Sequence, residues 1–269
     1  MMRVGVKAGQ WGWSFAELER SWEVAEEVGF NILACFDHVT AGPNEAASWD
    51  APALLAAMAA RTNRITLAVR VLNVCLRHVF LLASQLAVVQ AVSGGRLDVG
   101  LGAGSFGLAR HDHVALTIPF PAVGDRMARL EAACRLLPAL WRGERVTDQG
   151  LGLSGASLGP IGITPPLVVG GASERAIAIA ARYCDGLNLS TANPDELTDA
   201  RRQAERYCSD LGRPAPIAVE AQLWARDLWA DARSHIRAFE ASGAEAVILV
   251  LDHERGPNEL RRLADTVLL

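Results

Sequence analysis

Short apolar runs alternate with longer amphipathic stretches along the whole chain. Each run is rich in Val, Ile and Leu, and a turn separates it from roughly 10–18 residues with helical spacing. This alternation predicts βαβ units and a parallel sheet. The predicted strands cover residues 3–8, 30–36, 65–71, 96–102, 166–170, 185–190, 216–223 and 244–251.

Local signals mark the ends of the predicted helices. Ser14 with Glu17 three residues later has the pattern of a capping box, and Gly29 is a C-cap glycine. Pro194 stands at the first position of its helix, where its missing N–H costs nothing. The predicted helices cover residues 14–28, 50–63, 80–92, 124–142, 173–183, 194 onward, 227–241 and 257–267.

Eight strands and eight helices in this order predict a (β/α)8 TIM barrel, built as a single domain from residues 1–269. The main alternative, a doubly wound open sheet, would carry GxGxxG after its first strand, and this chain has AGQWGW there. Residues 144–165 form the longest irregular stretch, so we interpret them as a candidate active-site loop or lid.

Composition narrows the classes of function. Hydrophobic residues make up 51% of the chain, charged residues 21%, and the net charge is −4. The arginines are scattered among the acids, which argues against nucleic acid as a partner, and no apolar run has the length of a membrane span. The start of the chain, MMRVGVKAGQW, lacks the features of a signal peptide, so we expect a cytoplasmic protein.

Reactive residues are few. The five cysteines are an odd number without a CxxC pair, which favours free thiols over disulfides or zinc. Lys7 is the only lysine, so Schiff-base chemistry would have to use it. GxSxG is absent as a strand-to-helix turn, which argues against a serine nucleophile.

Two glycine clusters lie where predicted strands end, which is the working end of a barrel. GLGAGS at 100–105 ends the fourth strand, and VGGASE at 169–174 leads from the fifth strand into a helix. Small residues let backbone N–H groups approach a ligand, and a helix N-terminus favours anions, so the clusters predict a phosphate site. The alternative is that these glycines only serve tight turns and packing.

Polar pairs follow two of the strands. Asp37 and His38 come directly after the second strand, where alternation would aim one into the mouth and the other aside. They could hydrogen-bond a cofactor ring or move a proton, or else cap a turn and face solvent. Arg77 and His78 follow the third strand and could pair with an anion or with acids on the rim.

Aromatic and acidic residues in other loops suggest two further sites. The tryptophans Trp11, Trp13 and Trp49 could wall an apolar substrate pocket, or could simply pack. A metal site could be assembled from Glu220, Asp252, His253 and His38, but these four residues have no HxH or HExxH spacing, so we predict no metal.

Four long stretches within residues 14–192 carry a family pattern. They read ELERSWEVAEEVGFNILACFDHV, RTNRITLAVRVLNVCLRHVFLLASQLAVVQAVSGGRLDVGLGAGS, IPFPAVGDRMARLEAACRLLPALWRGERV and PPLVVGGASERAIAIAARYCDGLNLS. In these stretches the chain resembles the bacterial luciferase-like monooxygenase superfamily and, within it, the coenzyme F420-dependent oxidoreductases common in actinobacteria. SGGRLDVGLGAG combined with IPFP and GDRMARLEA is the most specific part of the resemblance.

The resemblance implies a deazaflavin cofactor, coenzyme F420, in the barrel mouth, with hydride transfer to or from a small organic substrate. Its ring would lie near Asp37, which would anchor polar atoms, and His38, which would give or take a proton. The family has a cis peptide without proline at the end of the third strand, here about Arg70–Val71. The implied cofactor contacts are Arg70, Val71, Gly102, Ala103, Gly104, Gly170, Gly171, Ala172 and Ser173.

The chain also departs from the family pattern. It is shorter than the usual member, Arg70 stands where small residues are common and could crowd the ring, and the usual proline after Arg77–His78 is absent. Alternatives are an FMN-dependent monooxygenase that uses O2, a flavin-binding barrel without turnover, and a metal-dependent isomerase or hydrolase. The substrate and the direction of transfer are open, and a homodimer is compatible with the sequence.

Overall fold

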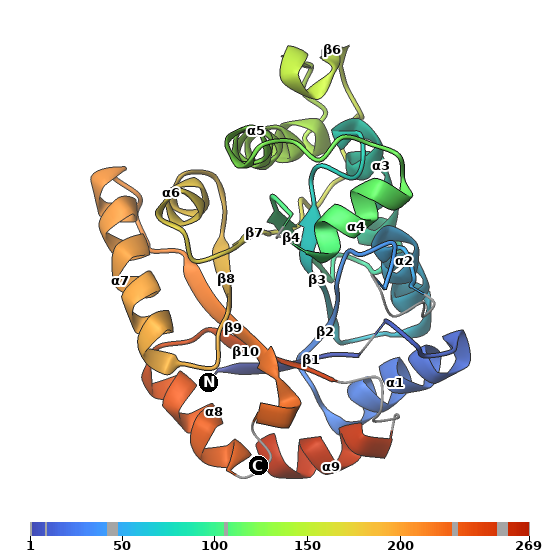
Figure 1. Cartoon of the computed structure of the whole chain (residues 1–269), viewed down its shortest axis with the longest axis vertical. Coiled ribbons are helices and arrows are strands. Elements are labelled where there is room, and N and C mark those ends of the chain that lie inside the picture. Colours follow the sequence, from blue (N-terminus) through green and yellow to red (C-terminus); the bar gives the residue numbers. More distant parts are fainter. Residues whose placement is uncertain are drawn as a thin grey trace.

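Eight parallel strands close into a barrel, as the sequence predicts (Figure 1). The computed structural model describes residues 2–8, 10–41, 48–104, 107–227, 231–251 and 258–268. The barrel strands are β1 (Arg3–Lys7), β2 (Ile32–Cys35), β3 (Thr66–Asn73), β4 (Leu97–Gly102), β7 (Leu167–Gly170), β8 (Gly186–Ser190), β9 (Ala218–Trp224) and β10 (Ala246–Val250). They lie side by side in this order, and β10 pairs with β1 to close the cylinder.

Helices surround the barrel, and their ends follow the predicted signals. They are α1 (Phe15–Val28), α2 (Ala51–Arg61), α3 (Val79–Val92), α4 (Leu108–Ala115), α5 (Val123–Trp141), α6 (Glu174–Tyr183), α7 (Pro194–Asp210), α8 (Ala232–Ala241) and α9 (Asn258–Val267). The capping box is confirmed: the backbone N–H of Glu17 donates to Ser14 Oγ at 3.3 Å, and that of Ser14 donates to Glu17 Oε2 at 2.8 Å. Gly29 ends α1 with φ of 96°.

Two segments differ from the prediction. The stretch 144–165 holds an antiparallel hairpin of β5 (Val146–Asp148) and β6 (Leu153–Ala156), which lies outside α5 in Figure 1. None of its described residues lines the cavity at the barrel mouth, so the expected role as an active-site lid is wrong. The loop before α5 contains α4, which the sequence did not predict because LARHDHVA is short and no side chain caps its N-terminus.

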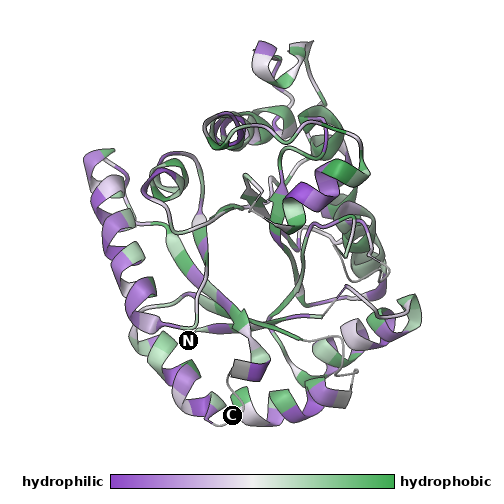
Figure 2. Ribbon diagram, in the orientation of Figure 1, coloured by the Kyte–Doolittle hydropathy of each residue, from purple (hydrophilic) through white to green (hydrophobic). Residues whose placement is uncertain are grey.

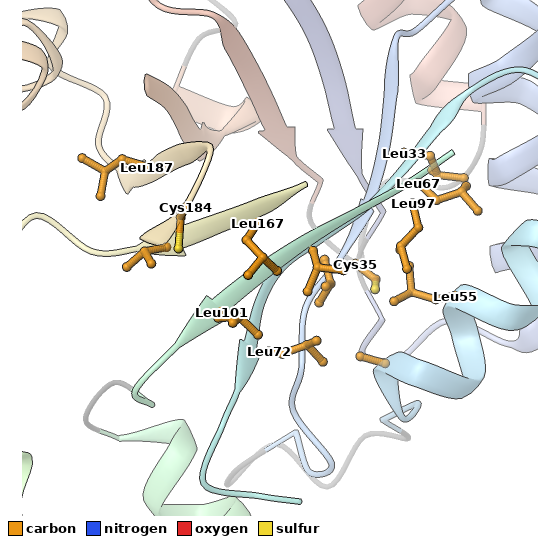
Figure 3. Close-up of a cluster of buried hydrophobic side chains, with 14 of the residues drawn as sticks. Leu33, Cys35, Leu55, Leu67, Leu72, Leu97, Leu101, Leu167, Cys184 and Leu187 are labelled. Atoms are coloured by element: carbon orange, nitrogen blue, oxygen red, sulfur yellow. The ribbon is translucent and has the colours of Figure 1, made fainter. Parts of the chain in front are cut away.

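Apolar side chains form two layers. Inside the N-terminal half of the barrel, Ile32, Ala34, Ala68, Ala246 and Ile248 form a compact plug. Outside the strands, a larger core fills the space beneath the helices; Figure 3 shows leucines of β2, β3 and β4 together with a leucine of α2. The outer faces of the helices carry most of the hydrophilic residues (Figure 2). The plug seals one end of the barrel, which leaves the C-terminal ends of the strands as the open end.

The position of the Val71 side chain explains why several residues in the predicted clusters are glycine. The Arg70–Val71 peptide bond is cis, as the resemblance implies, and the register of β3 against β4 shifts at this point. A Cβ on Gly102 would lie 2.5 Å from Val71 Cγ2, and one on Gly170 would lie 2.8 Å from Val71 Cγ1. A Cβ on Gly100 would lie 2.9 Å from Val71 Cγ1 and closer still to a backbone carbonyl. These three glycines are therefore required by packing, whatever binds above them.

Replacing Gly100 tests this packing without touching the cavity lining. Gly100→Ala is expected to lower the free energy of unfolding by about 1–3 kcal/mol, the cost of overpacking a tight core. Gly124→Ala is the matched control, because a Cβ there meets nothing within 4 Å and alanine favours the helix. Denaturant unfolding of both variants measures the difference; equal stabilities would contradict the role given to Val71.

Candidate active site

A cavity of about 800 Å³ opens at the C-terminal ends of the strands. It brings together most of the residues predicted from the sequence. Those that line it are Trp11, Asp37, His38, Arg70, Val71, Gly102, Ala103, Gly104, Gly170, Gly171, Ala172 and Ser173. Both Asp37 and His38 face it, so the expectation that alternation turns one of them aside is wrong: β2 ends at Cys35, and the chain leaves strand geometry before this pair.

Two of the three predicted pocket tryptophans lie elsewhere. Trp13 is 3% exposed and belongs to the hydrophobic core. Trp49 donates its indole N–H to the Trp13 carbonyl at 3.3 Å and packs edge-on against Phe15. Trp11 alone of the three lines the cavity, where its ring packs against Phe36 at 4.4 Å between centroids.

Asp37 is buried beneath the rim and held by two donors. Its Oδ2 accepts from Arg77 Nη1 at 2.7 Å and from the Asn73 backbone N–H at 3.0 Å. Burial raises the pKa of Asp37 above its usual value, although Arg77 and the Asn73 N–H act in the opposite direction. Arg77 also pairs with Asp50, the N-cap of α2, so its charge is shared between two acids on the rim. His78 next to it caps α3.

Three buried polar atoms on the cavity wall have no hydrogen-bond partner in the structure. They are Trp11 Nε1, Asp37 Oδ1 and Asn73 Nδ2. The Asn73 amide is oriented by the Cys75 backbone N–H, which donates to Asn73 Oδ1 at 3.0 Å and leaves Nδ2 as the unused end. An unsatisfied buried polar group costs about 1–3 kcal/mol. A bound ligand that offers both acceptors and a donor along one edge would remove this cost.

His38 is held by an acid that the sequence analysis missed. Its Nδ1 lies 2.7 Å from Asp112 Oδ2, on α4. Asp112 Oδ1 accepts from the backbone N–H groups of Val39 and Thr40 at 3.1 and 3.0 Å, and from the Thr40 hydroxyl. Burial raises the pKa of Asp112. The hydrogen bond and charge of His38 and the hydrogen bonds from Thr40 outweigh this effect, so the pKa of Asp112 lies below its usual value. An ionised Asp112 assigns the Nδ1 hydrogen to His38 and leaves Nε2 free.

Arg70 forms the floor of the cavity. Its guanidinium is fully buried, donates to Asp98 Oδ2 at 2.9 Å and to Glu220 Oε2 at 3.1 Å, and is also bonded to Glu220 through Nε. Asn188 Nδ2 donates to Glu220 Oε1 at 2.9 Å. Burial alone would lower the pKa of Arg70, but Glu220 and Asp98 raise it, so the guanidinium stays charged. Its charge is therefore balanced within the protein.

The second glycine cluster leads into the N-terminus of α6. Gly171 has φ of 127°, which only glycine adopts readily, and Gly104 in the first cluster has φ of 77°. Ser173 caps α6 by accepting the Ala176 N–H at 3.2 Å. The positive end of a helix dipole beside flexible backbone favours an anion such as phosphate.

The structure also bears on a metal site and on a membrane span. Among the residues that the structure describes, no three His, Cys, Asp or Glu side chains converge as metal ligands. Asp252 and His253 of the proposed metal set lie outside the described residues. Within the same residues, no helix is both long and apolar enough to cross a membrane.

Comparisons with known proteins agree with this geometry. Residues 2–266 match the family model described as luciferase-like monooxygenase. A relative from Beutenbergia cavernae, named F420-dependent glucose-6-phosphate dehydrogenase, is 28% identical over 99% of this chain and 81% of its own length. One of the same name from Nakamurella multipartita is 30% identical over 76% of this chain and 61% of its own length.

Solved structures show the same fold. An F420-dependent secondary alcohol dehydrogenase in complex with an F420–acetone adduct superposes with a TM-score of 0.86 and 18% identity, over 99% of this chain and 98% of that one. A coenzyme F420-dependent tetrahydromethanopterin reductase from Methanopyrus kandleri gives 0.79 and 14%, over 99% and 98% of the two chains. With the family model matched along almost the whole sequence, the chain belongs to the luciferase-like monooxygenase family.

Proposed function

We propose that this protein is an oxidoreductase that transfers a hydride between coenzyme F420 and a small organic substrate. The observation that carries the proposal is the set of unpartnered buried atoms, Trp11 Nε1, Asp37 Oδ1 and Asn73 Nδ2, on one wall of the cavity. The names of the curated relatives, which are F420-dependent enzymes, support the choice of cofactor.

The cavity residues fit a deazaflavin. The pyrimidine edge of such a ring alternates carbonyl acceptors with an N–H donor, which complements two donors and one carboxylate oxygen. A volume of about 800 Å³ lies within the usual range for cofactor sites. The phosphate of the tail would lie against Gly171 and the N-terminus of α6, where the backbone favours an anion.

Bound F420 supplies the hydride donor or acceptor, and the protein positions the reacting groups and handles the proton. In the proposed role, Asp37 anchors the ring edge, since its second oxygen is already fixed by Arg77 and Asn73. His38 gives a proton to, or takes one from, the substrate oxygen at Nε2. Asp112 is a positioning residue, because it holds the other ring nitrogen and stabilises the charge that His38 gains.

The choice between cofactors is testable by titration, following protein and cofactor fluorescence. F420 is expected to bind well below millimolar concentrations and more tightly than FMN. Asn73→Ala should weaken F420 binding roughly tenfold, the value of a lost buried hydrogen bond. Asn63→Ala, at an exposed position that does not line the cavity, is the control and should leave the affinity unchanged.

Three results would argue against the proposal in different ways. Tighter binding of FMN would favour a flavin-dependent monooxygenase. Binding of F420 without reduction or oxidation by any of a panel of alcohols and sugar phosphates would favour a carrier without turnover. Failure of both cofactors to bind would remove the redox function altogether.

The ionised state of Asp112 is tested by stability as a function of pH. Its pKa lies below the usual 3.8, so its stabilising contribution is complete above about pH 4 and is lost as the pH falls through the lowered value. Asp112→Asn should therefore cost most near neutral pH, and its deficit in unfolding free energy should shrink in acid. Asp210→Asn, at an exposed position, is the control. A deficit that is constant or grows on acidification would contradict an ionised Asp112.

A further inference from the structure

Lys7 lines the cavity, but the proposed reaction makes no use of its charge. Lys7 is the only lysine in the sequence. The side chain of Lys7 lies at the end of β1, is 4% exposed, and lines the same cavity as Asp37 and His38. A lone lysine buried at this position calls for an explanation, because an ammonium group loses hydration when it is buried.

The amino group has a donor left for a ligand. Lys7 Nζ donates to the Arg70 carbonyl at 2.7 Å and to Gln222 Oε1 at 2.9 Å. A protonated lysine carries three N–H groups, so these two bonds leave one. Within the described residues, no carboxylate lies close enough to Lys7 to form an ion pair.

Gln222 extends this arrangement to a second donor. Its Oε1 is occupied by Lys7, so its amide Nε2 points the other way and donates to Ser190 Oγ at 2.6 Å. Because Ser190 accepts at its oxygen, its own hydroxyl hydrogen is available, and Ser190 also lines the cavity. Lys7 on β1, Gln222 on β9 and Ser190 on β8 therefore form one hydrogen-bonded row. Lys7 and Ser190, at the two ends of this row, each have one donor left.

We propose that Lys7, Gln222 and Ser190 form a subsite that binds an anionic oxygen of a ligand in this cavity. The oxygen belongs either to the substrate, as a carboxylate or a developing alkoxide, or to the deprotonated ring of the cofactor. The subsite does not depend on the proposed function, because a simple carboxylate can occupy it without any cofactor.

The surrounding charges set the pH range in which the subsite works. The groups that face Lys7 are the Cys35 thiol on β2, Arg70 on β3 and Glu220 on β9. Burial lowers the pKa of Lys7 to about 8, and Arg70 adds to the lowering while Glu220 opposes it. Lys7 is therefore mostly protonated at pH 7 and mostly neutral at pH 9.5, so anion binding should weaken across this interval.

Benzoate and its uncharged analogue benzamide provide a matched pair of probes. Binding is measured by tryptophan fluorescence at pH 7 and pH 9.5 in the full chain without cofactor. Benzoate should bind more tightly than benzamide at pH 7, and this preference should fall at pH 9.5. Lys7→Met should weaken benzoate binding roughly ten- to a hundredfold, the value of a hydrogen bond to a charged group, and leave benzamide unchanged.

Two further variants keep the test decisive if Lys7→Met does not fold. Gln222→Glu keeps Lys7 but places a carboxylate beside it, so benzoate binding should again be lost. Arg202→Met removes an exposed charge on α7, away from the cavity lining, and should leave benzoate binding unchanged. A second titration with F420 alone, in the same variants, separates the two sources of the oxygen.

A Lys7-dependent loss of benzoate binding with unchanged F420 binding assigns the subsite to the substrate. A Lys7-dependent loss of binding for both benzoate and F420 assigns it to the cofactor. If F420 does not bind at all while benzoate binding still depends on Lys7, the subsite stands and the proposed function fails. Equal binding of benzoate and benzamide in the native protein, or affinities for benzoate and F420 that ignore Lys7 and pH, would overturn the proposal.

Discussion

The buried ion-pair network of Arg70, Asp98 and Glu220 joins β3, β4 and β9 inside the barrel. Asp98 and Glu220 lie in register with Ala68 and Ala246 of the apolar plug, and Arg70 lines the cavity that collects the candidate active-site residues. Removing one member of a buried network typically costs about 3–5 kcal/mol, since an uncompensated charge remains. Arg70 also supplies the carbonyl that holds Lys7, so the floor of the cavity and the group above it form one hydrogen-bonded unit.

Regular periodicity made the fold predictable. Eight apolar runs and the signals at Ser14, Gly29 and Pro194 indicate the barrel, and the structure confirms them. The hairpin within 144–165 escaped prediction because its strands have only three and four residues and lie in a glycine-rich segment. Helix α4 escaped because it has only eight residues and no side-chain N-cap, and its Asp112 was missed with it. Only the folded chain brings Asp112 beside His38, 74 residues earlier.

The residue types in the sequence predicted where the site lies, but not why each residue is needed there. The glycine clusters were interpreted as phosphate loops, yet Gly100, Gly102 and Gly170 are required by the side chain of Val71, and Gly104 and Gly171 by their backbone conformation. Packing and backbone conformation thus account for these glycines without a ligand. Conversely, tryptophans in loops gave a weak signal, because Trp13 lies in the hydrophobic core and Trp49 donates its indole N–H to the Trp13 carbonyl.

A crystal structure of the protein with oxidised coenzyme F420 tests the central claim most directly. The account predicts that electron density for the ring lies in the cavity above Val71, with its polar edge within hydrogen-bond distance of Asp37 Oδ1 and Asn73 Nδ2. It also predicts the phosphate at the N-terminus of α6. Density for the ring outside this cavity, or a ring in the cavity that leaves these polar atoms without partners, would contradict the account.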